Sequence, residues 1–307
     1  MKFLKLILPV FIFPVMLACS ESNPAEEISV PKPDPVSLQG PIEKIKSNTL
    51  LVKTVSFDTT IVIREGVKQY QIQYLNPDDQ PLSLYILEVD LNRPELSIQN
   101  SMPNNSTTFA LQTVPRIAQF EQAEGNHVLA AVNADYFLAG GVPWGAVIKR
   151  GTVLKTTFEN SKHTWFGLDK TGAPLIGAAP DFITAQPNLQ IAVGGKEPLV
   201  EKGFGTFNTN SAREPRTIVG YTDKKIVYLM VADGRQASHS IGMTLKELTQ
   251  VMLALGAKEA INLDGGGSAT FVVKNKEKGT YDVLNKPSDG SPRSVANALT
   301  VISSLTN

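Results

Sequence analysis

The chain has 307 residues, of which 42% are hydrophobic and 19% are charged. This composition is typical of a globular protein with a substantial core and excludes a disordered chain. The 29 basic and 29 acidic residues balance, so no overall charge points to nucleic acid or to a cationic partner.

Residues 1–18 have the pattern of a secretory signal peptide. Lys2 and Lys5 precede an apolar run over residues 6–18, which is too short to span a bilayer comfortably. The run ends in Met16-Leu17-Ala18-Cys19, which resembles the lipobox of bacterial lipoproteins. We therefore expect an exported protein, lipidated at Cys19 and anchored to a bacterial membrane at its periplasmic face or at the cell surface. The alternative is an ordinary signal peptide that contains a cysteine.

Residues 19–41 are expected to form a tether between the lipid and the folded part. The segment is polar and acidic and contains Pro24, Pro31, Pro33, Pro35 and Pro41. Such a segment buries too little apolar surface to fold, and its prolines keep it extended. Cys19 is also the only cysteine, so the chain forms no intramolecular disulfide.

Residues 50–307 are predicted to form a single domain of strands with a few helices. Apolar–polar alternation and short apolar runs predict strands over residues 67–73, 82–91, 96–98, 128–132, 146–148, 152–154, 217–220, 226–232, 260–263 and, last, 295–298. Helices are expected over residues 113–124 and 245–255; the second has a capping box formed by Thr244 and Glu247. We predict an α+β or α/β fold, with a mixed β-sheet and flanking helices.

Three predicted strands end in polar residues that are followed by small ones. These ends are Asn133-Ala134-Asp135, Asp233-Gly234-Arg235 and Asn262-Leu263-Asp264. A single Asp-Gly pair is usually a turn. Because strand ends meet at one edge of a sheet, where ligands commonly bind, three such ends together predict one site.

The third strand end continues into Gly265-Gly266-Gly267-Ser268. Three glycines cost more backbone entropy than a tight turn requires. They predict a nest of main-chain N–H groups that binds a phosphate or an oxyanion, with the Ser268 hydroxyl as a further donor. Asp264 would repel a phosphate and is expected to act as an acid, a base or an acceptor for sugar hydroxyls. The run lacks the Lys-Ser/Thr pair of a P-loop, which argues against nucleotide hydrolysis.

Arginines are expected to supply the positive charge. Arg216, Arg235 and Arg293 lie in loop-like stretches near these strand ends, and guanidinium groups bind phosphate with two parallel hydrogen bonds. Arg213 is expected instead to be solvated or to form a structural ion pair.

The remaining residue types limit the other kinds of chemistry. The three histidines lack the spacing of a zinc motif, and His239 is expected to be a polar surface residue. No Gly-x-Ser-x-Gly elbow of a serine hydrolase occurs. No cofactor is expected, although a divalent cation held by Asp233 and Asp264 is an open alternative.

Together these motifs resemble the phosphodiester glycosidase family. The resemblance runs from about Leu82 to the C-terminus. It rests on Asn133…Phe137, Gly145, Arg216-Thr217…Gly220, Asp233-Gly234-Arg235, Leu263-Asp264-Gly265-Gly266-Gly267-Ser268 and Arg293…Asn297. Asp135 departs from the pattern, which has a small residue at that position.

The resemblance implies a hydrolase that cleaves a sugar-1-phosphodiester and releases the sugar and a phosphomonoester. The expected catalytic residues are Asp264, Asp233 and Asp135. The expected substrate- and phosphate-binding residues are Asn133, Gly145, Arg216, Thr217, Arg235, Asn262, Gly265, Gly266, Gly267, Ser268, Arg293 and Asn297. Two alternatives stay open: a glycosidase that cleaves neutral glycosidic bonds of a polysaccharide, and a surface lipoprotein that binds glycan without cleaving it.

Overall fold

A computed structural model describes residues 40–305 of the chain. The expected signal peptide, Cys19 and all but the end of the expected tether lie outside these residues. Within the described range, no helix is long and apolar enough to cross a membrane.

The compact unit begins before residue 50, where the sequence placed its start. The described part of this unit starts at residue 40 and includes a helix, α1 (Pro41–Asn48). Pro41 stands in the first turn of α1, where its missing N–H costs no hydrogen bond. Ile42 and Ile45 are buried in the same apolar cluster as the helix α4 (Leu245–Ala254). The last proline of the expected tether therefore begins the domain.

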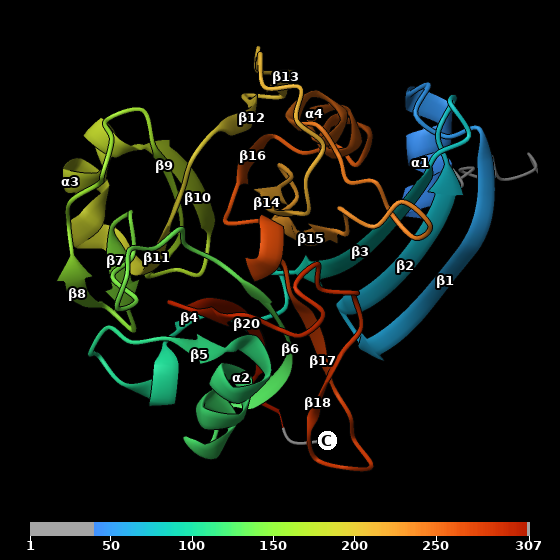
Figure 1. Ribbon diagram of the computed structural model, residues 1–307. Helices are drawn as coiled ribbons and strands as arrows, with labels where there is room; N and C mark the ends of the chain where they lie inside the picture. Colours follow the sequence, from blue (N-terminus) through green and yellow to red (C-terminus); the bar gives the residue numbers. More distant parts are fainter. Residues whose placement is uncertain (1–39, 306–307) are drawn as a thin grey trace, which may run out of the picture. The chain divides into compact units, whose positions relative to one another are not determined.

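Most of the domain is β-structure arranged in several sheets (Figure 1). The largest has eight strands in the order β1 (Thr54–Arg64), β2 (Val67–Leu75), β3 (Pro81–Asp90), β15 (Ile226–Ala232), β14 (Arg216–Tyr221), β16 (Glu259–Asn262), β12 (Pro198–Glu201) and β13 (Phe204–Gly205). A five-stranded sheet has the order β10 (Pro174–Ala178), β9 (Thr164–Asp169), β11 (Leu189–Gly195), β7 (Val147–Lys149) and β8 (Thr152–Lys155).

A second five-stranded sheet has the order β18 (Tyr281–Val283), β17 (Phe271–Lys274), β6 (His127–Asn133), β20 (Ala298–Ser303) and β4 (Leu96–Ser101). The short strands β5 (Gln112–Thr113) and β19 (Ser294–Val295) form a separate pair.

The prediction of a mixed sheet is wrong, because neighbouring strands of the described residues pair antiparallel throughout. Among the pairs are β3 with β15, β14 with β16, and β6 with both β17 and β20. The strand β6 has the continuous apolar run that is common in parallel strands. Leu129 and Val132 point into the central core, while Val128 and Ala131 pack beneath helix α2 (Val114–Ala123). Burial on both faces produces the same apolar run in an antiparallel strand.

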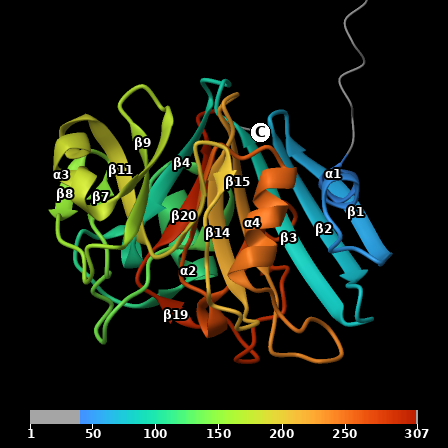
Figure 2. The ribbon, with the colours of Figure 1, turned by 90° about the horizontal axis from the view of Figure 1, so that it is seen from above.

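The core lies where the three large sheets face one another. Its members include Leu87 and Val231 from the eight-stranded sheet, Phe166 from one five-stranded sheet and Phe271 and Leu299 from the other. The strand β3 supplies alternate residues to this core and to the cluster under α1 and α4, as its period of two requires. Figure 2 shows α4 next to β15 and β3, and α1 next to β2 and β1.

Helices cover the outer faces of the sheets. The predicted helix over residues 245–255 is confirmed as α4, with Thr244 and Glu247 forming the capping box, and the helix over residues 113–124 is confirmed as α2. The helix α3 (Phe182–Ala185) packs on the sheet of β9 and β11, where Phe182 is buried against Trp165. The short 3-10 helices are η1 (Pro103–Asn105), η2 (Ala179–Asp181), η3 (Gln186–Asn188) and η4 (Gly266–Ser268).

The C-terminal part differs from the prediction at one point. The expected final strand over residues 295–298 is interrupted at residues 296 and 297, and the chain resumes as β20. The side chain of Asn297 leaves the ladder and binds Asp135, at the end of β6. This interruption lies beside the glycine run, which forms η4 near the centre of Figure 1.

Candidate active site

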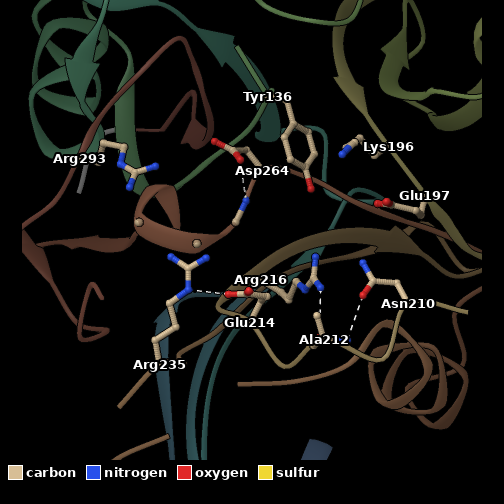
Figure 3. Close-up of a pocket in the computed structure, with 13 residues that line it drawn as sticks. Tyr136, Lys196, Glu197, Asn210, Ala212, Glu214, Arg216, Arg235, Asp264 and Arg293 are labelled. Atoms are coloured by element: carbon tan, nitrogen blue, oxygen red, sulfur yellow. Dashed lines mark hydrogen bonds and ion pairs between the residues drawn. The ribbon is translucent and has the colours of Figure 1, made fainter. Parts of the chain in front are cut away.

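A polar cavity of about 320 Å³ opens over the glycine run (Figure 3). It is lined by Tyr136, Lys196, Glu197, Asn210, Ala212, Glu214, Arg216, Arg235, Asp264, Gly265, Gly266, Gly267 and Arg293. Its volume is within the range of small-molecule sites. Seven of the residues that the sequence predicted lie here: Asp264, Gly265, Gly266, Gly267, Arg216, Arg235 and Arg293.

Asp264 is held in the wall of the cavity by residues at the ends of two other strands. Its main-chain N–H donates to the carbonyl of Ala134 (2.9 Å), and its carbonyl accepts from the side-chain amide of Asn133 (2.6 Å). The Oδ1 of Asn133 in turn accepts from the hydroxyl of Thr217 (2.7 Å) and the N–H of Thr270 (3.1 Å). Asn133 and Thr217 are fully buried. They position Asp264 and do not line the cavity, so the prediction that they bind substrate is wrong.

The carboxyl group of Asp264 is suited to proton transfer near neutral pH. Burial raises its pKa to about 6, and the N–H of Gly265 and the charges of Arg293 and Lys196 oppose the rise. Gly265 N–H donates to Oδ1 of Asp264 at 2.9 Å. A group with a pKa near the working pH combines the correct protonation state with a useful driving force for proton transfer.

The main-chain N–H groups of Gly265, Gly266 and Ser268 are bonded within the protein and so are not free for the predicted nest. The N–H of Gly265 binds Asp264, and that of Gly266 donates to the carbonyl of Pro215 (2.9 Å). The N–H of Ser268 donates to the carbonyl of Gly265 (3.1 Å), and Ser268 is fully buried, beside Asp264. The glycines instead allow close packing. A Cβ on Gly265 would collide with the carbonyl of Pro215, and one on Gly267 with the Arg293 guanidinium.

The positive charge of the cavity comes from side chains. Arg235 and Arg293 flank the glycine run (Figure 3), and each also binds an acidic residue, Glu214 (Nε–Oε2 2.6 Å) and Asp289 (Nε–Oδ2 2.8 Å) respectively. Each pair uses only part of a guanidinium, which has five N–H donors.

Arg216 is different from these two arginines. Its side chain is buried (8% exposed), and its Nη2 donates a 3.3 Å hydrogen bond to the carbonyl of Ala212, but its Nε has no partner in the described part of the chain. No carboxylate of residues 40–305 forms an ion pair with it. A buried charge without a counter-ion costs several kcal/mol, about 3–5 kcal/mol when a partner is removed. An anion in the cavity would supply the counter-ion that Arg216 lacks within residues 40–305.

The second carboxylate in the cavity, Glu197, was missed by the sequence reasoning. The amide of Asn262 donates to Oε2 of Glu197 (3.0 Å) and to the hydroxyl of Tyr136 (2.8 Å). Asn262 is fully buried and positions these two groups. Burial raises the pKa of Tyr136, so its hydroxyl keeps a proton that it can donate into the cavity.

Lys196 completes this side of the cavity. Its ammonium lies 4.8 Å from the ring centre of Tyr136 and 5.2 Å from that of Trp144, which is a cation–π geometry. Lys196 and Glu197 directly follow β11, which ends in Gly194-Gly195. Here too a buried strand ends in a mixture of small and polar residues, although the small residues come first, and this was the available signal.

Asp233 is not in the cavity. It is 1% exposed, and both carboxylate oxygens are occupied: Oδ1 accepts from Asn285 (2.9 Å), while Oδ2 accepts from the N–H of Lys286 (2.9 Å) and contacts Nε2 of His239 (2.8 Å). The prediction of a catalytic Asp233 is therefore wrong, and His239, whose side chain is 19% exposed, contacts Asp233. Asp233 fixes the turn that presents Arg235.

Asp135 is also structural. It is 1% exposed and accepts hydrogen bonds from the amide of Asn297 (2.8 Å) and the N–H groups of Gly194 (2.9 Å) and Gly145 (3.3 Å). Burial raises the pKa of Asp135 to about 7. A Cβ on Gly145 would collide with Gly194. Asp135, Gly145 and Asn297 hold the end of β11, and hence Lys196, in place, so the predictions that they touch substrate are wrong.

Two further predictions concern charge. Arg213 forms a structural ion pair, one of the two expected arrangements, with Glu247 at 2.6 Å. Within residues 40–305, no group of three or more His, Cys, Asp or Glu side chains is placed to hold a metal ion. Asp233 and Asp264, the pair considered for a divalent cation, do not share a cavity.

Comparison with known proteins agrees with this arrangement. A family model for phosphodiester glycosidases matches residues 126–302, more than half of the chain. The chain is 22% identical over 311 residues to the SPbeta prophage-derived uncharacterized protein YomE of Bacillus subtilis, covering 94% of this chain and 45% of that protein. It is 27% identical over 175 residues to N-acetylglucosamine-1-phosphodiester alpha-N-acetylglucosaminidase of Bos taurus, covering 50% of this chain and 32% of that enzyme. The chain thus spans less than half the length of these relatives.

Two solved structures share the fold. The catalytic domain of zebrafish N-acetylglucosamine-1-phosphodiester alpha-N-acetylglucosaminidase aligns with a TM-score of 0.56 at 21% identity, covering 82% of this chain and 83% of that one. A hypothetical protein from Synechocystis aligns with a TM-score of 0.61 at 16% identity, covering 80% of this chain and 64% of that one. The family model includes β6, β16, Glu197, Arg216 and the glycine run. The chain belongs to the phosphodiester glycosidase family.

Proposed function

We propose that this protein hydrolyses a sugar-1-phosphodiester, releasing the sugar and leaving a phosphomonoester on the other product. The observation that carries the proposal is the buried guanidinium of Arg216, without an acidic partner in the described chain, in the same cavity as the Asp264 carboxyl. An anion is needed beside Arg216, and a carboxyl group is needed at a sugar carbon.

The phosphate is proposed to lie between Arg216 and the two arginines that flank the glycine run. Arg235 and Arg293 approach from that side, and Tyr136 and Arg216 lie between them and Glu197 (Figure 3). Charge-assisted hydrogen bonds to a phosphate are about twice as strong as neutral ones. Three arginines also balance the acidic groups Asp264, Glu197 and Glu214, which would otherwise repel the substrate.

In the proposed reaction, the bond between the anomeric carbon and the phosphate oxygen breaks. Its electron pair leaves on the phosphate oxygen, while a water molecule adds to the anomeric carbon and gives its proton to Asp264. Glu197 faces the positive charge that develops on the sugar ring. Arg216 and the Tyr136 hydroxyl stabilise the departing phosphate, so a strong general acid is not required.

The names of the relatives suggest the first substrate to test. The bovine and human proteins are both N-acetylglucosamine-1-phosphodiester alpha-N-acetylglucosaminidases. A simple alkyl ester of N-acetylglucosamine α-1-phosphate is therefore the first probe, and the neutral alkyl α-glycoside of the same sugar is its matched control.

We expect turnover of the phosphodiester and not of the neutral glycoside. Arg216→Met should lower kcat/KM by about 100-fold or more, because it removes a charge that binds the leaving group. Arg116→Met is the matched control, since Arg116 lies exposed on α2 above the ring of Phe120, and it should keep full activity. Equal turnover of the neutral glycoside, or binding of the phosphodiester without turnover, would contradict the proposal.

The proposed location is outside the cytoplasm, with the protein anchored through a lipid on Cys19. Support comes from the basic and apolar N-terminus and from the lipobox-like Met16-Leu17-Ala18-Cys19. Labelled palmitate should be incorporated into the wild type and not into Cys19→Ala. Equal labelling of both, or labelling of neither, would contradict lipid anchoring.

A further inference from the structure

A second and larger cavity adjoins the first one. It has a volume of about 530 Å³ and shares Lys196 and Glu197 with the cavity over the glycine run. Its other walls come from two loops, which contribute Asn160, Lys162 and His163 on one side and Phe207, Asn208 and Thr209 on the other. The two cavities therefore meet at Glu197, one of the two carboxylates proposed to act at the sugar.

The second cavity lies on the sugar side of the proposed site. Arg235 and Arg293 approach the first cavity from the side of the glycine run, whereas Lys196 and Glu197 lie on the opposite side of Tyr136 (Figure 3). If the arginines hold the phosphate, the anomeric carbon lies toward Glu197. Whatever extends past Glu197 is then attached to the sugar and not to the leaving group.

The residues around the second cavity suit a carbohydrate. Phe207 is 93% exposed and offers an uncovered aromatic face, against which the C–H face of a sugar ring buries apolar area. The ring of His163 is held by stacking on Trp144, with ring centres 5.7 Å apart and planes 2° from parallel. Asn160, Asn208 and Thr209 supply the amide and hydroxyl groups that hydrogen-bond to sugar hydroxyls.

We infer that the second cavity binds a further sugar residue, so that the natural substrate is an oligosaccharide-1-phosphodiester, cleaved at its reducing-end phosphate. The inference rests on the proposed function and further specifies that the glycan has at least two sugar residues. An enzyme for a single sugar would have no use for an open cavity larger than the one that holds the reacting bond. Lys162 and Lys196 at the rim also accept an acidic substituent on that further sugar.

The experiment compares alkyl phosphodiesters of N-acetylglucosamine with those of a panel of disaccharides that have N-acetylglucosamine at the reducing end. For at least one linkage, the disaccharide should have a kcat/KM about tenfold higher, through a lower KM, because partial burial of one aromatic face is worth about that factor. Phe207→Ala should bring the ratio of disaccharide to monosaccharide close to one. Phe204→Ala, an exposed residue nearby that does not line this cavity, should keep the ratio.

Each other outcome contradicts one of the two claims separately. Equal or lower kcat/KM for every disaccharide, or a preference that survives Phe207→Ala, overturns the second sugar site and leaves the proposed function intact. If no phosphodiester is hydrolysed, the proposed function fails. Calorimetric binding of the free reducing sugars then decides the inference: a disaccharide should bind about tenfold more tightly than the monosaccharide, and only in protein that retains Phe207.

Discussion

The side-chain amide of Asn262 donates a 3.0 Å hydrogen bond to the carboxylate of Glu197. Asn133, at the end of β6, holds Asp264 through the main chain: its side-chain amide donates to the carbonyl of Asp264. Both asparagines are fully buried. Each carboxylate proposed to act on the sugar is thus positioned by an asparagine from the end of another strand.

Removal of the Asn262 amide should impair catalysis more than binding. Asn262→Ala frees Glu197 and Tyr136 together, and a misplacement of about 1 Å costs about 100-fold in rate. We expect kcat to fall by about that factor with little change in KM. Asn275→Ala is the control, because Asn275 binds Asp282 at the surface. Equal kcat for Asn262→Ala and the wild type would show that Asn262 does not position Glu197.

Removal of the Asn133 side chain should lower the stability of the domain. It leaves the carbonyl of Asp264, the hydroxyl of Thr217 and the N–H of Thr270 without their partner. We expect Asn133→Ala to lower the free energy of unfolding in urea by about 2–4 kcal/mol, and Thr217→Val by about 1 kcal/mol because it removes one bond. A smaller loss for Asn133→Ala than for Thr217→Val would contradict this arrangement.

Substitutions at Asp233 and Asp264 should have opposite effects on stability and activity. Asp233→Asn disturbs the bonds to His239 and to the N–H of Lys286 and should cost about 1–3 kcal/mol of unfolding free energy. Folded Asp233→Asn should keep kcat within about tenfold of the wild type, whereas Asp264→Asn should lose at least about 100-fold. The assignment fails if Asp233→Asn abolishes turnover in folded protein.

The pKa of Asp264 predicts the acidic limb of the pH profile. As a base, Asp264 must be ionised, so kcat/KM should fall as the pH drops through about 6. The folded-state pKa is above the ordinary aspartate pKa of 3.8, so the folded state binds more protons between these two values. The unfolding free energy that this group contributes therefore decreases as the pH rises from about 4 to about 6.

Asp264→Asn removes that contribution. At pH 7.5 it should be more stable than the wild type by about 1–2 kcal/mol, after allowance for partial solvent screening, and the difference should vanish near pH 4. Urea unfolding at the two pH values measures this. A variant that is less stable than the wild type at pH 7.5 would mean that the Asp264 charge is not strained in the fold.

The predictions from sequence were most successful where local signals coincided with tertiary structure. The capping box and apolar face of α4 and the hairpin of β2 and β3 were predicted close to their observed bounds. The strand β1 was missed because both of its faces are largely exposed. Its sequence therefore lacks a clear alternation of apolar and polar residues. The direction of strand pairing was missed because it is set by the packing of whole sheets.

The site could be predicted only in part, because its assembly also depends on tertiary structure. Sequence shows which polar residues follow strands, but not whether their oxygens face solvent or are already occupied. Asp264 and Asp233 look alike in sequence; one lines the cavity, and the other is enclosed by Asn285, Lys286 and His239. Glu197 follows a strand that pairs with β9 in another sheet, and only tertiary structure brings it to Asp264.

The most direct test of the proposed chemistry is the position of bond cleavage, measured by hydrolysis of the N-acetylglucosamine phosphodiester in water enriched in ¹⁸O. If water attacks the anomeric carbon beside Asp264 while Arg216 holds the leaving phosphate, the label appears in the released sugar, and the phosphomonoester stays unlabelled. Mass spectrometry of the two products, taken before the sugar exchanges its anomeric oxygen with solvent, distinguishes the outcomes. Label in the phosphomonoester would show attack at phosphorus and contradict a glycosidase mechanism.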